Sequence, residues 1–299
     1  MTEYLKEFKY EGKSAPISMV LRVSGLSSPA WYDKRKRKGT LSSIKPGPKV
    51  LYTDQEVVVK VKEVLSNPYF HGEGYKKLKV RLSAVGIQVG KERLLRLLKE
   101  HNLLAHQRYN PNGSSRPHTG TIITAQVNQM YACDIKEWRC KEGQFYMFTV
   151  IDHYNDEIIS HLSSLKATAA LANEVLRMAI IKRFQSVKKD ICKSIGLQFR
   201  TDHGSQFIAQ EFEKEVYFLG ITLSRAFVRS PECNGVIERY HRTIKEQIGH
   251  LIKEFDYQRA FAEIDLFVPK YNQHWLLHRL GLQSPIEYRI NNENKDECI

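Results

Sequence analysis

Three acidic residues occupy positions where carboxylates can support phosphoryl-transfer chemistry. Asp134 follows the apolar run 130–133 and Asp202 follows the run 197–201, so each is expected at the end of a strand, while Glu238 falls on a long helix. Carboxylates are preferred ligands of Mg²⁺ and Mn²⁺, and two such ions can hold both the attacking and the leaving oxygen of a phosphodiester. A single Asp at a strand end is more often a capping or turn residue, so the three acids carry weight only together.

The helix that carries Glu238 is expected over about 234–253. One stripe of this helix is apolar and would pack on a sheet: Ile237, Ile244, Ile248 and Leu251. Glu238 lies on an adjacent face with Asn234, Arg242 and Lys245, at offsets of four and seven residues. This face therefore offers one carboxylate and two cations, which suits a DNA backbone lying beside bound metal ions.

The elements that must position these acids read as an α/β fold. Strands are expected at 130–133, 145–151, 158–162, 197–201 and 221–223, and helices around 171–178, 207–218 and 234–253. Three consecutive strands followed by alternating helices and strands predict a sheet with one antiparallel hairpin edge.

The segments around the acids resemble the motifs of retroviral integrases and related transposases. Segment 201–207 (TDHGSQF) resembles the second-aspartate motif, 230–238 (SPECNGVIE) the glutamate motif, and 128–134 (NQMYACD) the first-aspartate strand. Asp202 and Glu238 have 35 residues between them, the spacing characteristic of the DDE group. The segments 74–78 and 271–288 are also similar to bacterial insertion-sequence transposases whose catalytic half is encoded by a second reading frame (OrfB type).

This resemblance implies a fold and an activity. The fold would be an RNase H-like integrase core, a five-stranded mixed sheet flanked by helices, preceded by small all-α helix-turn-helix units. Asp134 and Asp202 would bridge two Mg²⁺ or Mn²⁺ ions, and Glu238 would complete the shell of one. Water would cleave a phosphodiester at the element end, and the freed 3′-hydroxyl would attack target DNA. The resemblance also implies a homo-oligomer on DNA and a possible fusion with an upstream-frame product.

The chain departs from the family pattern at three residues near the acids. His203 stands where many integrases have Asn, and Lys136 and Trp138 replace smaller residues after the first aspartate. None is a proposed metal ligand, so these departures bear on substrate contacts rather than on the chemistry.

The net charge of +13 is concentrated in the N-terminal part of the chain. Residues 1–125 carry 23 Lys and Arg against 10 Asp and Glu, whereas residues 126–299 carry 23 of each. A concentrated positive charge suits DNA, because each neutralised phosphate releases counterions. The alternative is a merely solvated basic surface.

Two helical units are expected within this basic part. Residues 1–48 would hold a helix-turn-helix-like segment (17–23, a turn at Gly25, then a helix from Ser27) and a basic linker; residues 49–110 would hold a second DNA-binding unit. In that second unit, Lys91, Arg93 and Arg96 lie mostly off the leucine face of a helix over 91–103, which is either a recognition helix or an ordinary exposed helix. A linker at 111–125, a catalytic core at 126–290 and a tail at 291–299 complete the predicted organisation.

Cysteine usage and hydropathy exclude several other classes of protein. The chain has 5 Cys in scattered positions and no CxxC pair, which indicates reduced thiols and no disulfide framework. Its early histidines have no Cys partner before Cys133, so no zinc site is expected: His71, His101, His106 and His118. No apolar run reaches the length of a membrane span, and residues 1–7 lack the apolar part of a signal peptide. A location in the bacterial cytoplasm or nucleoid is expected.

Four other features have two readings each. Asp152 is either a turn residue or an assistant to the site, and His241 either contacts DNA or is a surface residue. Trp31 and Tyr32 belong either to a small core or to a base-stacking surface. The run Lys34–Lys38 is a solvated linker that either also touches phosphate or makes no such contact.

Two other functions compete with transposition. A structure-specific nuclease would use the same fold without strand transfer. A DNA-binding protein with an inactive core would lack the intact acidic triad.

Overall fold

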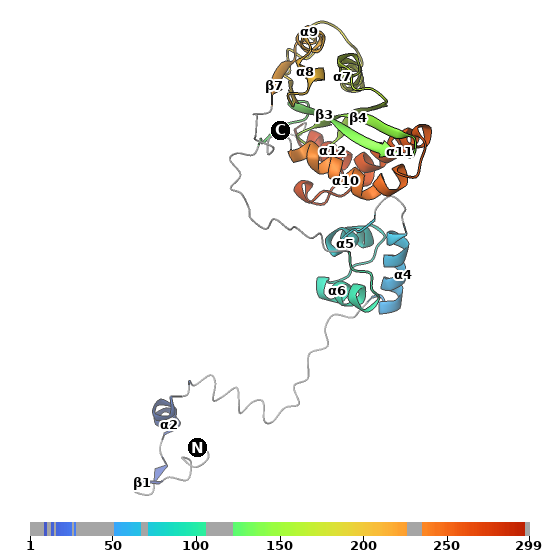
Figure 1. Ribbon diagram of the computed structural model, residues 1–299. Coiled ribbons are helices and arrows are strands. Elements are labelled where there is room, and N and C mark those ends of the chain that lie inside the picture. The colour runs from blue at the N-terminus through green and yellow to red at the C-terminus, as the bar shows by residue number, and fades with distance from the viewer. Residues whose placement is uncertain are drawn as a thin grey trace. The chain divides into compact units, whose positions relative to one another are not determined.

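A computed structural model describes residues 9–10, 13–14, 16–25, 27, 51–66, 71–105, 122–225 and 235–296 of the 299-residue chain (Figure 1). The chain divides into two compact units, 1–53 and 54–299. Among the described residues, no helix is long and apolar enough to cross a membrane.

The described residues of the first unit form a short antiparallel hairpin and one helix. Strands β1 (Lys9–Tyr10) and β2 (Lys13–Ser14) form the hairpin, which the sequence did not predict. Helix α2 (Ile17–Ser24) is the first predicted helix, and it ends at Gly25 with φ of 66°, a left-handed conformation that glycine adopts at low cost. The expected helix after Ser27, the ring pair at 31–32 and the basic run at 34–38 lie outside the described residues.

The second unit begins with three helices around a small aliphatic core. Helices α4 (Asp54–Leu65), α5 (Tyr75–Ala84) and α6 (Lys91–Glu100) bury one face each. The fully buried side chains include Val57, Leu78, Leu82, Leu94 and Leu97. The predicted leucine face of α6 is therefore confirmed. The helix ends before residue 103 because the backbone at Asn102 turns into the left-handed region with φ of 54°.

A five-stranded sheet forms the centre of this second unit. Its strands are β3 (Met130–Cys140), β4 (Gly143–Asp152), β5 (Ile158–Ser164), β6 (Gln198–Thr201) and β7 (Thr222–Arg225), in the order β5-β4-β3-β6-β7. β3, β4 and β5 pair antiparallel, whereas β6 and β7 join β3 in parallel. The predicted mixed sheet with an antiparallel hairpin edge is confirmed, and so is the RNase H-like fold class.

Helices cover both faces of the sheet (Figure 1). One face packs on α7 (Ala169–Phe184), α8 (Ser205–Ile208) and α9 (Gln210–Phe218); the other packs on α10 (Gly235–Ile252) and α11 (Tyr257–His274). The chain then passes through the short 3₁₀ helix η2 (His278–Leu280) into α12 (Pro285–Asp296), which runs into the segment expected to be a tail. Alternation along β3 decides which face each side chain meets, because neighbouring residues of a strand point to opposite faces.

β3 is longer than the sequence pattern predicts. The apolar run stops at Cys133, but the strand continues to Cys140 because 134–140 pair with 143–149 of β4 and because Trp138 is buried under α10. Asp134 therefore lies inside a strand rather than at its end. Asp134 lies beyond the part of β3 that pairs with the parallel strand β6.

Candidate active site

The sheet register brings the two aspartates to neighbouring positions. Ala132 of β3 lies opposite Arg200 of β6, and Asp134 and Asp202 each follow two residues later. Neighbouring strands lie about 4.8 Å apart, and residues two apart share a face. Ala132 packs in the core under α10 and α11, so Asp134 faces the same two helices. The parallel pairing of β3 with β6 thus places both carboxylates at one edge of the sheet, below α10.

Asp134 is held on both of its carboxylate oxygens. Its Oδ1 accepts a hydrogen bond from the backbone amide of Ile135 at 2.9 Å. Its Oδ2 lies 3.3 Å from Nδ1 of His241, a residue of α10. The side chain remains 25% exposed, so Asp134 has a fixed orientation and an open side.

Asp202 follows β6 and leads into α8. It is exposed, and its Oδ1 accepts a hydrogen bond from the backbone amide of Gly204 at 2.9 Å. Gly204 precedes the first residue of α8. A Cβ at Gly204 would lie 3.0 Å from that same oxygen, so glycine permits the close approach of backbone to carboxylate.

Glu238 lies in the first turn of α10, on the exposed side of that helix. Its neighbours Ile237 and Tyr240 are buried under the sheet and fix the rotation of the helix. Partial burial and the negative charge of Asp134 raise the pKa of Glu238. The two carboxylates are therefore electrostatic neighbours.

The buried thiol of Cys133 lies close enough to both Asp134 and Asp202 for their charges to affect its pKa. Burial, and then the charges of Asp134 and Asp202, raise the pKa of Cys133 well above its usual value. Glu238 and Asp202 are thus each coupled to the surroundings of Asp134.

The three carboxylates are nevertheless too far apart in this structure to bind one metal ion together. Within the described parts of the chain, no three His, Cys, Asp or Glu side chains stand close enough to hold one metal ion. Carboxylates repel one another in the absence of a cation. The donor set fits a hard divalent cation, since all three groups are carboxylates. Burial, and then the charge of Asp134, raise the pKa of Glu238, and a bound cation would offset the second of these effects.

Some of the residues predicted to bind DNA are exposed, whereas others form ion pairs with acidic residues. Arg242 and Lys245 are exposed on α10, on the side that carries Glu238, whereas Asn234 lies outside the described residues. On α6, Arg93 and Arg96 both form ion pairs with Asp54, at 2.6 and 2.7 Å, and Lys91 lies 3.6 Å from Glu92. Two of the three α6 residues predicted to bind DNA thus form ion pairs with the first turn of α4 within the helical unit.

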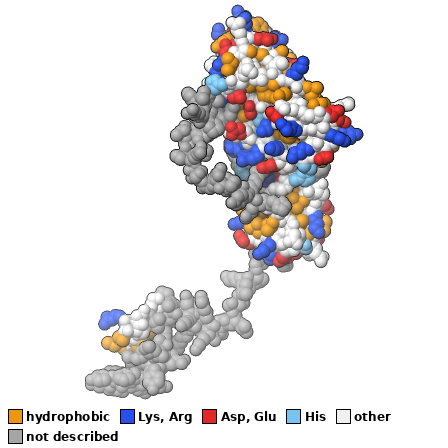
Figure 2. All heavy atoms as spheres, in the orientation of Figure 1, with side chains coloured by type: hydrophobic (Ala, Val, Ile, Leu, Met, Phe, Trp, Pro, Cys, Tyr) orange, Lys and Arg blue, Asp and Glu red, His pale blue; other side chains and the backbone are white. Residues whose placement is uncertain are grey.

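Lys and Arg also gather on the catalytic half itself. Figure 2 shows Lys and Arg side chains, with some Asp and Glu among them, on the side of the molecule where Figure 1 labels α10, α11 and α12. The balanced charge of residues 126–299 is therefore not evenly spread over that surface.

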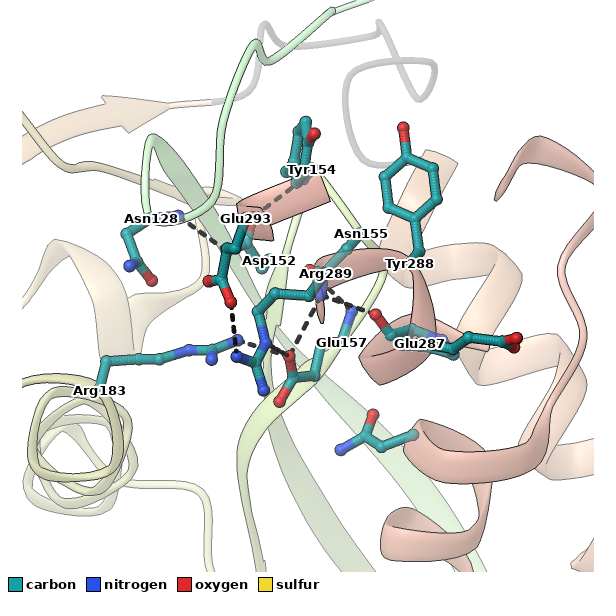
Figure 3. A network of polar contacts seen from close by, with 12 residues as sticks. Asn128, Asp152, Tyr154, Asn155, Glu157, Arg183, Glu287, Tyr288, Arg289 and Glu293 are labelled. Carbon is teal, nitrogen blue, oxygen red and sulfur yellow. Dashed lines mark hydrogen bonds and ion pairs between the residues drawn. The ribbon is translucent and has the colours of Figure 1, made fainter. Parts of the chain in front are cut away.

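Asp152 is a turn residue, as the first of its two readings predicts. Its carboxylate is fully buried at the end of β4 and accepts hydrogen bonds from the amides of Asn128 and Tyr154, both at 2.9 Å (Figure 3). It lies opposite Tyr131, whereas Asp134 lies opposite Thr149, so three residues of β4 separate Asp152 from the level of the site. It does not belong to the acidic constellation.

Burial raises the pKa of Asp152 to about 6, against the backbone amides that lower it. The folded chain therefore holds this proton more tightly than the unfolded chain, whose reference value is 3.8. Stability from this group is fully present below about pH 4 and is lost as the pH rises through about 6. Relative to Asp152→Asn, we expect the wild type to gain about 2 kcal/mol of unfolding free energy between pH 7 and pH 4.5.

Urea unfolding of the two proteins at both pH values measures this difference. Because other carboxylates titrate equally in both proteins, the comparison isolates Asp152. A difference that does not change with pH would contradict the assignment.

The sequence did not predict that His241 lies beside Asp134. His241 is 5% exposed, so its reading as a surface residue is wrong. The available signal was its position one helical turn after Glu238, but the partner on β3 is more than 100 positions away in the chain.

Comparison with known proteins agrees with this geometry. The family model described as "Integrase core domain" matches residues 124–231, which include both aspartates and all five strands of the sheet. The chain contains an integrase core domain. The match ends seven residues before Glu238, which α10 supplies to the same edge of the sheet.

The curated relatives of this integrase core are insertion-sequence transposases. The chain is 27% identical over 203 residues to the putative transposase InsD for insertion element IS2E of Escherichia coli K12, covering 67% of this chain and 91% of the relative. It is also 27% identical to the transposase InsD for IS2A/D/F/H/I/K of Escherichia coli, covering 67% of this chain and 66% of that relative. The chain is therefore homologous to transposases, which with the integrases are polynucleotidyl transferases, and this homology supports a role in DNA transposition and integration.

Solved structures of retroviral integrases are also similar to the chain. The HTLV-2 integrase catalytic core domain in complex with magnesium has a TM-score of 0.43 and 16% identity, covering 55% of this chain and 98% of that one. The simian T-cell lymphotropic virus intasome in complex with the PP2A regulatory subunit B56 gamma has a TM-score of 0.48 and 16% identity, covering 77% and 74%.

Proposed function

We propose that this chain is a DDE transposase that cleaves DNA at the ends of an insertion sequence and joins the freed ends to target DNA. The observation that supports the proposal is the pairing of β3 with β6, which brings Asp134 and Asp202 to neighbouring strands, with Glu238 close enough to Asp134 for their charges to interact. A second supporting observation is the homology to IS2 transposases.

In this proposal the three carboxylates hold Mg²⁺ or Mn²⁺. When bound, the metal would activate the attacking oxygen and stabilise the charge that develops on the phosphodiester. Asp134, held by the amide of Ile135 and by His241, supplies oxygens in a fixed orientation. Asp202, held by the amide of Gly204, supplies the second carboxylate, and Glu238 supplies the third from α10.

The exposed cations of α10 would hold the DNA backbone across this edge. Arg242 and Lys245 follow Glu238 at helical spacing on the same side. The N-terminal helical units would add sequence-independent affinity through their positive charge, with Lys91, Arg93 and Arg96 of α6 as the proposed contacts. For Arg93 and Arg96, contact with DNA would require exchange of their ion pairs with Asp54.

Two DNA ends must be joined in one event, so we propose that the chain acts as a homo-oligomer on DNA. A fusion with an upstream-frame product is a further part of the proposal, because the chain resembles second-frame transposases. The proposed setting is the bacterial nucleoid, since the named relatives belong to insertion elements of Escherichia coli.

The test is an assay for both chemical steps. Purified full-length chain is incubated with labelled duplex DNA from the two flanks of its own gene, a target plasmid, and Mg²⁺ or Mn²⁺. Joined products that require the metal support transposition. Nicked DNA without joining contradicts strand transfer and favours a nuclease, and binding without any product contradicts catalysis.

A close contact at Asp202 provides a sharper test of the site. In Gly204→Ala the new Cβ would lie 3.0 Å from Oδ1 of Asp202 and 3.0 Å from Oε1 of Gln206, so that both side chains would have to shift slightly. We expect DNA cleavage to slow by about tenfold or more, because small displacements of catalytic groups are costly.

Gly74→Ala is the matched control for this prediction. Gly74 also precedes a helix, and nothing lies within 4 Å of a Cβ there. Equal cleavage rates of the two variants would show that the contact at Gly204 has no bearing on Asp202.

A further inference from the structure

A buried histidine lies between the edge of the sheet and the helix that carries Glu238. His241 is on α10, three residues after Glu238. Its ring is buried and faces Asp134 of β3 and Thr149 of β4. The ring contacts Tyr240 on its own helix at a centroid distance of 5.8 Å. A buried imidazole loses water on both nitrogens, so the partners of those nitrogens determine what it does.

Each ring nitrogen of His241 faces one polar side chain. Nδ1 lies 3.3 Å from Oδ2 of Asp134, and Nε2 lies 3.5 Å from the Oγ1 of Thr149. Thr149 is fully buried and is the residue directly opposite Asp134 on β4. The ring thus spans a cross-strand pair, with a carboxylate at one nitrogen and a hydroxyl at the other.

The acceptor-only carboxylate of Asp134 fits a proton on Nδ1 of His241. The hydroxyl of Thr149 can either donate to Nε2 or accept from it. The other oxygen of Asp134 already accepts from the amide of Ile135 at 2.9 Å. Each oxygen of the carboxylate therefore has a polar neighbour, one from β3 and one from α10.

We infer that His241 is a positioning residue, which orients Asp134 for metal binding and ties the Glu238 helix to the strand of Asp134. This inference rests on the proposed function, because it gives Asp134 the role of a metal ligand. Residues that orient a metal ligand commonly contribute 10- to 100-fold to metal affinity. His241 would not touch DNA or the reacting atoms.

The test measures Mn²⁺ binding to the full-length protein without DNA, by electron paramagnetic resonance. His241→Leu keeps an apolar side chain of similar size and removes both nitrogens, and we expect Mn²⁺ affinity to fall by about 10- to 100-fold. His241→Asn places an amide nitrogen near the position of Nδ1, and we expect affinity within a few-fold of wild type. His241→Gln reaches toward Thr149 instead, and we expect a loss close to that of Leu.

Three comparisons make the outcome decisive. His250→Leu changes a histidine at an exposed position of the same helix and should bind Mn²⁺ as wild type does. Asp134→Asn should lose binding; if it binds normally, the proposed function itself fails. If Asp134→Asn loses Mn²⁺ but His241→Leu does not, or if Asn and Gln lose it equally, the role of His241 is overturned while the proposed function stands. Because Asn and Gln both keep a polar group, their comparison decides the matter even if the Leu variant fails to fold.

Discussion

Replacing Asp202 with Asn is expected to abolish both DNA cleavage and strand joining. The substitution keeps the shape of the side chain and its oxygen toward the amide of Gly204, but it removes the negative charge that a metal ion requires. Metal stabilisation of a phosphoryl transfer is worth several kcal/mol, and each 1.36 kcal/mol is a factor of ten, so we expect a loss of about 10³-fold or more. Cleavage rates on flank DNA, followed over hours with Mg²⁺ and with Mn²⁺, measure it.

The control for this prediction is Asp265→Asn. Asp265 is 67% exposed and forms a pair with His161, so its loss should leave both chemical steps intact. Asp202→Asn should still bind DNA and keep the wild-type circular dichroism spectrum, because Asp202 is exposed and carries no core contact. Retention of cleavage in Asp202→Asn to within tenfold would rule out Asp202 as a ligand.

Breaking the buried ion pairs of Glu157 is expected to cause the largest loss of stability. Glu157 is 2% exposed and lies 2.6 Å from Arg183 of α7 and 3.0 Å from Arg289 of α12, with Asn155 donating at 3.1 Å (Figure 3). Burial opposes ionisation, but the two guanidinium groups hold the pKa of Glu157 below its ordinary value. Glu157 therefore joins helices from both faces of the sheet at one point.

Glu157→Gln leaves two guanidinium groups at a buried site without their shared countercharge. Removing one partner of a buried pair typically costs about 3–5 kcal/mol, and we expect an unfolding free energy lower by about that amount. Glu293→Gln is the matched control, since Glu293 also pairs with Arg289, at 3.2 Å, but is 46% exposed and should cost about 0.5 kcal/mol or less. Urea unfolding at pH 7 measures both. Equal stabilities of the two variants would contradict this account of the network.

The sequence predicted the parts of the fold that depend on local pattern. The apolar run before Asp202 and the amphipathic stripe on α10 were read correctly because strand and helix periods are visible over a few residues. The extension of β3 past Asp134 was missed, since its second half alternates polar and apolar residues and is held by pairing with β4. The expected helix at 207–218 is divided into α8 and α9 at Ala209, whose ψ of 133° is extended, and nothing in its sequence marks that break.

The candidate site shows the same division. The three acids could be recognised because each lies in a motif of neighbouring residues. The spacing between Asp202 and Glu238 can also be read directly from the sequence. The contact of His241 with Asp134 could not be recognised, because it joins distant segments. The same holds for the buried ion pairs of Glu157 with Arg183 and Arg289, which lie away from the three acids. The basic residues of α6 illustrate the reverse, since their exposure was predicted but their ion pairs with Asp54 were not.

The most direct test is a crystal structure of the full chain grown with Mn²⁺, with anomalous scattering recorded to locate the ions. We predict anomalous peaks between the carboxylates of Asp134 and Asp202, with the Glu238 carboxylate moved in to contact one of them. Peaks bound elsewhere, or ions held by the aspartates while Glu238 stays beyond ligand distance, would contradict the proposed site.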